Sequence, residues 1–141
     1  DGTIYVTDLV YSREGMEVTE GLVADLLLRS DTRTAAVESN NGGRGFARAV
    51  QRLVPAVRVE WVHQSANKEA RILSNSATAL HLVRFPRGWN LRWPELYAHL
   101  TTYRRKFRAN RWHDAADVVT GIVEREAAGR GQKRVRGIRF L

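Results

Sequence analysis

The chain has no cysteine among its 141 residues, so disulfide bonds and thiolate zinc sites are both excluded. It has no apolar run near the roughly 20 residues of a membrane-spanning helix and no opening signal-peptide pattern, so we expect no membrane partner. The phosphate-binding pattern Gly-x-x-x-x-Gly-Lys-Ser/Thr is also missing, which argues against an ATP-driven motor on this stretch of sequence. Because the first residue is Asp1 rather than Met, the chain is either processed or cut from a longer one, and we expect the latter.

Positive charge is abundant and unevenly distributed. The net charge is +8, and residues 101–141 contain eleven Lys or Arg against four acids. Such a basic region attracts polyanions, nucleic acid above all, through counterion release. A solvated surface or a disordered tail is the alternative explanation for residues 130–141. With 43% hydrophobic residues, we expect one globular domain over residues 1–129 and a basic C-terminal tail over 130–141.

Hydrophobic periodicity predicts alternating strands and helices. The predicted strands are Thr3–Tyr11, Thr34–Glu38, Val57–Val62 and a short one at Leu80–Phe85. The predicted helices are Thr19–Arg29, Phe46–Leu53, Asn67–Ala79, Pro94–Arg108 and His113–Ala128. This alternation is typical of an α/β layer fold.

Two acidic motifs far apart in the sequence suggest a catalytic site. Glu38 ends an apolar run and is followed by a Gly-rich turn, Asn40-Asn41-Gly42-Gly43. Asp114 and Asp117 lie three residues apart, on one face of the last predicted helix. Carboxylates from a strand end and a helix start are the oxygen ligands that divalent metals need for phosphodiester cleavage. The alternatives are an ordinary surface acid at Glu38 and a helix N-cap at Asp114.

The order and spacing of these motifs resemble the C-terminal nuclease domain of the large terminase subunit of tailed bacteriophages. The resemblance covers nearly the whole chain. It is carried by Asp1–Asp8, Val37–Gly43, Asn67–Ile72, Phe85-Pro86 and the His-Asp start of the last helix. It implies a ribonuclease H-like fold, with a mixed central sheet flanked by helices.

The resemblance also implies a function. It implies a metal-dependent endodeoxyribonuclease that cuts concatemeric viral DNA during genome packaging in the host bacterial cytoplasm. Two ions, Mg²⁺ or Mn²⁺, are then expected at Glu38 and Asp114, with Asp117 as a further catalytic acid that binds metal or a metal-bound water. The partners implied are double-stranded DNA, the ATPase domain of the same subunit, the small terminase and the portal.

The chain departs from the family pattern at two places. Aligning on Asp117-Val118-Val119-Thr120-Gly121 gives Asp114 the ligand position and puts His113 in place of an acid. Another register sets His113 on the family's His and leaves Ala115 where the ligand belongs. The family's first metal acid lies on a strand before Asp1, so we expect the first strand to be missing. Asp8 is then either a substitute ligand or an ordinary polar residue of an edge strand.

Basic residues near these motifs are candidates for contacts with DNA phosphates. They are Arg44, Lys68, Arg71, Arg104, Arg105 and Arg111. Two alternatives to an active nuclease remain. One is an inactive fragment that serves as a basic module binding DNA or the packaging machine, and the other is a different ribonuclease H-like enzyme, such as a resolvase.

Overall fold

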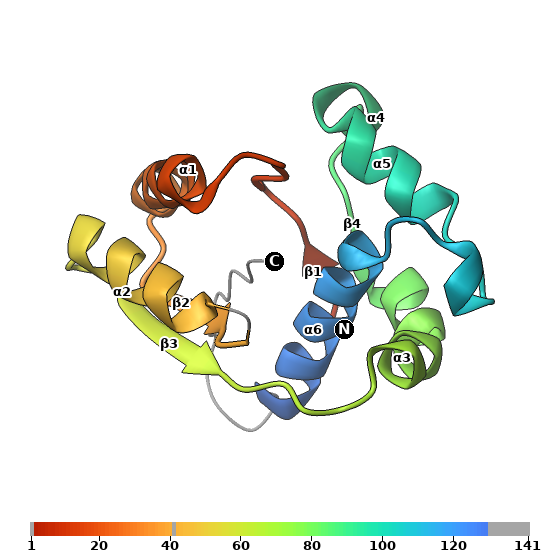
Figure 1. Ribbon diagram of the computed structural model, residues 1–141. Helices are drawn as coiled ribbons and strands as arrows, with labels where there is room; N and C mark the ends of the chain where they lie inside the picture. Colours follow the sequence, from red (N-terminus) through yellow and green to blue (C-terminus); the bar gives the residue numbers. More distant parts are fainter. Residues whose placement is uncertain (1, 41, 130–141) are drawn as a thin grey trace. The chain divides into compact units, whose positions relative to one another are not determined.

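A computed structural model describes residues 2–40 and 42–129, which divide into two compact units. Among these residues, unit 1 combines 2–7 with Ala66–Ala128, and unit 2 consists of 8–65, without residue 41, together with Gly129. Both units contain helices and short parallel strands, so the protein is of the mixed α/β class (Figure 1). The predicted basic tail, 130–141, lies outside the described residues.

Unit 2 is built on two parallel strands joined by a helix. Its elements are α1 (Met16–Arg29), β2 (Thr34–Glu38), α2 (Gly43–Leu53) and β3 (Arg58–Val62). β2 and β3 pair from Thr34 opposite Arg58 to Glu38 opposite Val62. The prediction of a strand over Thr34–Glu38 is confirmed at both ends. The two helices begin three residues earlier than predicted.

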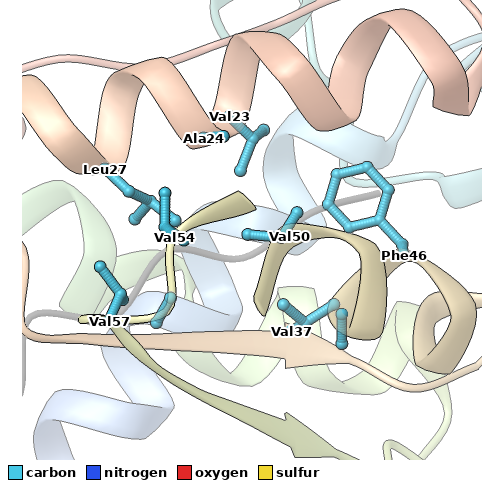
Figure 2. Packing of buried hydrophobic residues seen from close by; sticks show 10 residues of the cluster. Val23, Ala24, Leu27, Val37, Phe46, Val50, Val54 and Val57 are labelled. Atoms are coloured by element: carbon cyan, nitrogen blue, oxygen red, sulfur yellow. The ribbon is translucent and has the colours of Figure 1, made fainter. Parts of the chain in front are cut away.

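The core of unit 2 lies where α1 and α2 pack against β2 (Figure 2). Figure 2 shows Val23 and Leu27 from α1 near Val50 from α2, with Val37 from β2 beside them. All four side chains are at most 1% exposed. Their burial fixes β2 in place and thereby the position of Glu38 at its carboxyl end.

Truncating the most deeply buried leucine should destabilise unit 2 strongly. Leu27 is 0% exposed, whereas its neighbour Leu28 is 60% exposed on the same helix. We expect Leu27→Ala to reduce the free energy of unfolding by about 2–5 kcal/mol through lost burial and a residual cavity. Leu28→Ala is the matched control and should change it by less than about 0.5 kcal/mol. Urea denaturation followed by circular dichroism measures both; equal losses would contradict the packing in Figure 2.

Unit 1 is mainly helical. Its elements are β1 (Ile4–Tyr5), α3 (Lys68–Leu82), β4 (Val83–Arg84), α4 (Trp89–Arg92), α5 (Pro94–Thr101), the 3₁₀ helix η1 (Phe107–Ala109) and α6 (Asp114–Gly129). β1 and β4 pair in parallel, with Ile4 opposite Val83. The described strands thus form two separate two-stranded sheets. They do not form the single mixed central sheet that the resemblance implies.

Two predicted strands of unit 1 are wrong in extent. The strand predicted over Thr3–Tyr11 is limited to Ile4–Tyr5, because β4 offers only two residues as a partner. The strand predicted over Leu80–Phe85 is reduced to Val83–Arg84, because α3 continues to Leu82. Side-chain alternation alone does not make a strand, since the backbone groups also need a neighbour.

The helix predicted over Pro94–Arg108 ends at Thr101. At this end, the Thr101 and Thr102 hydroxyls donate to the carbonyl oxygens four residues earlier, at 2.7 and 2.6 Å. Such bonds compete with regular helical bonds and favour a helix end. The separate helix α4 was not predicted; Gly88 (φ +76°) precedes it, and Trp89 stacks on Phe85 with ring centroids 4.2 Å apart. Among the described residues, no helix is long and apolar enough to cross a membrane.

Candidate active site

Glu38 lies at the carboxyl end of β2, directly after three buried residues, 35–37. Its side-chain Oε1 accepts a hydrogen bond of 3.1 Å from Asn40 Nδ2. The same amide donates to the backbone oxygen of Gln64, 2.6 Å away, just beyond β3. Asn40 therefore connects the ends of both strands and orients the Glu38 carboxylate between them.

The Gly-rich turn after Glu38 allows a close backbone approach. Gly42 adopts the left-handed conformation, with φ +90°, and caps the start of α2. At Gly43, a Cβ atom would overlap the backbone carbonyl oxygen of Glu38. Glycine at Gly43 is thus required for α2 to begin against the end of β2. Arg44 follows it on the exposed side of the first turn.

Asp114 is the first residue of α6 in unit 1, and its side chain is 45% exposed. Its Oδ1 lies 3.3 Å from Lys68 Nζ on α3. The same ammonium lies 3.5 Å from His113 Nδ1. His113 in turn stacks on Phe107, with ring centroids 4.7 Å apart. Asp114 is therefore partly exposed to solvent, and its carboxylate also contacts a group of polar side chains.

Asp117 is one turn further along α6 and is buried. Its Oδ1 accepts from Arg71 Nη1 at 2.8 Å, and its Oδ2 lies 3.2 Å from Lys68 Nζ. Arg71 is also buried and binds Glu124 through Nε at 3.1 Å and Nη2 at 2.6 Å. Asn75 completes the group by donating to Glu124 Oε1 at 3.3 Å. We call Lys68, Arg71, Asp114, Asp117 and Glu124 the α3–α6 ion-pair network.

The network keeps Arg71 charged. Burial alone would lower the pKa of Arg71, since it disfavours the charged form. The hydrogen bond and charge of Glu124, together with those of Asp117, outweigh burial and raise the pKa above its usual value. Arg71 is therefore a permanent cation whose guanidinium binds two carboxylates, a geometry for which arginine is suited.

The structure distributes the predicted site residues over both units. Lys68, Arg71, Asp114 and Asp117 come together in unit 1. Arg71 lies in the interior, where its guanidinium pairs with acids and is not on a surface that a phosphate can reach. The other predicted DNA contacts, Arg44, Arg104, Arg105 and Arg111, are exposed, and Lys68 is half-buried. Glu38 is in unit 2.

The substitute ligand proposed at Asp8 has a structural partner. Asp8 lies beyond β1, and its Oδ2 is 3.1 Å from Arg29 Nη2. Within residues 2–40 and 42–129, no group of three or more His, Asp or Glu side chains is placed to hold a metal ion. The chain matches no known protein family, and no curated protein or solved structure is significantly similar to it.

The sequence analysis missed Asn75 and Glu124. A signal for both is present in the sequence. Asn75 lies four residues after Arg71, and Glu124 lies seven after Asp117, so each continues the polar face of its helix. What the sequence does not reveal is which helix faces pair, because Arg71 and Glu124 are 53 residues apart.

Proposed function

We propose that the chain is part of a metal-dependent DNA endonuclease with a ribonuclease H-like fold, of the kind found in the large terminase subunit of tailed bacteriophages. It cuts concatemeric viral DNA in the host cytoplasm and acts with the ATPase domain, the small terminase and the portal. The observation that carries the proposal is the position of Glu38 at the carboxyl end of a buried parallel strand, followed by a Gly-rich turn. Ligands of open α/β sheets bind at this end of the strands.

The residues differ in how well they suit a divalent cation. Glu38 and Asp114 are accessible carboxylates, the hard oxygen donors that Mg²⁺ or Mn²⁺ prefer. Asp117 fits less well as a direct ligand, since each of its oxygens already contacts a cation. We assign metal binding to the carboxylate of Glu38 within unit 2 and to that of Asp114 within unit 1, and we assign Asp117 to holding Lys68 and Arg71 in place.

When bound, the metal ions would supply the activation of a water and the stabilisation of the leaving oxygen in phosphodiester cleavage. The chain's own residues bind the DNA backbone and hold the carboxylates in position. Lys68 lies between Asp114 and Asp117 and partly neutralises both carboxylates, so its charge limits their mutual repulsion. Arg44, Arg104, Arg105 and Arg111 are exposed cations for the DNA backbone.

Asp114→Ala should abolish cleavage of supercoiled plasmid DNA. The wild-type chain is expected to nick the plasmid with Mn²⁺ or Mg²⁺ and to be inactive with EDTA. Because Asp114 is half-exposed at the start of α6, its loss should leave the fold intact. The matched control is Asp25→Ala, an exposed acid of α1, which should cleave like the wild type. Cleavage by Asp114→Ala and Glu38→Ala at wild-type rates would reject the proposed roles.

A non-catalytic basic module is the second candidate. The observation that favours it is the α3–α6 ion-pair network, in which Lys68 and Arg71 are bound to the acids of α6. This function predicts salt-sensitive DNA binding without nicking under any metal, both for this chain and for a longer one that adds an upstream segment. Nicking by the longer chain alone would instead identify this chain as a truncated nuclease.

A further inference from the structure

The segment between α5 and α6 concentrates exposed positive charge (cyan in Figure 1). No acid occurs between Glu95 and Asp114 in the sequence. Five basic residues of this segment are exposed: Arg104, Arg105, Lys106, Arg108 and Arg111. We call residues 104–111 the basic loop. Exposed positive charge of this density on one short segment attracts a polyanion.

Asn110 closes the basic loop on itself. Its Oδ1 accepts from the backbone N–H of Arg104 at 2.7 Å, and its Nδ2 donates to the Arg104 carbonyl at 2.8 Å. The same Nδ2 lies 3.3 and 3.1 Å from the carbonyl oxygens of Lys106 and Phe107. One side chain thus satisfies backbone groups at three positions and fixes the course of the loop.

Aromatic contacts hold the loop and its flanks to the rest of unit 1. Phe107 stacks on His113, and Trp112 stacks on His99 of α5, with ring centroids 5.6 Å apart. The Tyr103 hydroxyl, just before the loop, is buried. Burial, helped by the charges of Glu69 and Asp117, raises the pKa of Tyr103, so this residue stays neutral at physiological pH. The basic loop is therefore held to the rest of unit 1 by aromatic contacts, while its cationic side chains are exposed.

We propose that the basic loop binds the phosphate backbone of duplex DNA and that Asn110 is its positioning residue. This rests on the proposed function in taking DNA as the ligand, but it does not require cleavage. Four of the five cations are arginines, which recognise phosphate with two parallel hydrogen bonds. A loop already fixed in shape loses less conformational entropy on binding than a flexible one.

An anionic membrane suits the loop less well than DNA. Peripheral membrane segments combine basic residues with an exposed apolar face that enters the lipid. Residues 104–111 are all described, and the large apolar side chain among them, Phe107, is half-buried against His113. The adjacent Trp112 is 37% exposed, but its ring stacks on His99 of α5. The loop thus offers charge and hydrogen-bond donors, which match a phosphate backbone, without an apolar anchor.

The test measures the Kd for a 20-base-pair DNA duplex in EDTA over a range of salt concentrations. Asn110→Ala should raise the Kd about tenfold with all charges retained, because the loop must then be ordered on binding. Its salt dependence should stay close to that of the wild type. The matched control is Asn90→Ala, at an exposed asparagine of α4, which should bind like the wild type. Circular dichroism confirms that each variant is folded at the binding temperature.

A second variant keeps the test decisive if Asn110→Ala does not fold. Arg105→Gln/Arg108→Gln alters only exposed side chains and should reduce the slope of log K against log salt by about one unit per lost phosphate contact. Wild-type binding by this variant would overturn the proposed site, and wild-type binding by folded Asn110→Ala would overturn the positioning role. Tighter binding to duplex RNA or to phosphatidylserine vesicles would overturn the choice of DNA. Because EDTA prevents cleavage, a failed nuclease assay does not affect these outcomes.

Discussion

Arg71→Met should destabilise unit 1 by about 3–5 kcal/mol, the range found when one partner of a buried ion pair is removed. The substitution removes the guanidinium that binds both Asp117 and Glu124. Asp117, with a side chain only 4% exposed, then keeps Lys68 as its remaining partner in the network. Glu124 is 32% exposed and can be hydrated, so Asp117 accounts for most of the loss. Urea denaturation followed by circular dichroism measures it, because both units contain helices and the same signal therefore also reports on a control variant in unit 2.

The matched control for this prediction is Arg58→Met. Arg58 and Glu60 form an ion pair of 2.9 Å on β3, but the Arg58 side chain is 79% exposed. Exposed pairs contribute at most about 1 kcal/mol, so Arg58→Met should be nearly neutral. Asp117→Asn combined with Arg71→Met should lose less than the sum of the two single variants, because each removes the same contact. Additive losses, or equal losses for Arg71→Met and Arg58→Met, would contradict the network.

Gly43→Ala should destabilise unit 2 by about 1–3 kcal/mol, as expected when an atom is forced into a filled space. The added methyl group would overlap the backbone carbonyl of Glu38. That carbonyl has little freedom to turn away, because Glu38 is paired with Val62 of β3. Relief therefore requires the start of α2 to move off the end of β2. If Glu38 binds metal, the same variant should also lose cleavage.

Gly45→Ala provides a control on the same helical turn. A Cβ at Gly45 has no atom within 4 Å, and alanine is favoured over glycine inside a helix by up to about 1 kcal/mol. The two substitutions are chemically identical, yet their effects on stability should have opposite signs. Thermal unfolding followed by circular dichroism distinguishes them. A stabilising effect of Gly43→Ala would contradict the close approach at Glu38.

Local sequence patterns predicted unit 2 better than unit 1. The strand Thr34–Glu38 was located to the residue, because an apolar run bounded by turn residues defines it. Its partner β3 follows after one helix, so the pairing is local. β1 pairs instead with β4, nearly 80 residues away in the sequence, and the length of that partner set its two-residue extent. Such a limit is not visible in residues 3–11 themselves.

For the candidate site, too, the sequence predicted the positions of single residues better than their partners. The sequence placed Glu38 at a strand end and Asp114 at a helix start, and both positions are confirmed. It also placed Lys68 and Arg71 in the predicted helix Asn67–Ala79, but assigned them to DNA phosphates and not to the acids of α6. Charge type and spacing are encoded locally, whereas the partner of a charged side chain depends on which helices pack together. The metal and DNA roles stay predictions.

The pairing of β1 with β4 also has a consequence for the order of folding. Among the described residues, all of unit 2 except Gly129 comes from the stretch 8–65, which lies in the sequence between two parts of unit 1. During synthesis, unit 2 has all of its strands and helices as soon as β3 is complete, whereas β1 has to wait until Val83 and Arg84 emerge. The entropic penalty of closing a long loop rises with its length. Once unit 2 is folded, the stretch 8–65 is ordered, so fewer flexible residues separate β1 from β4 when these two strands pair.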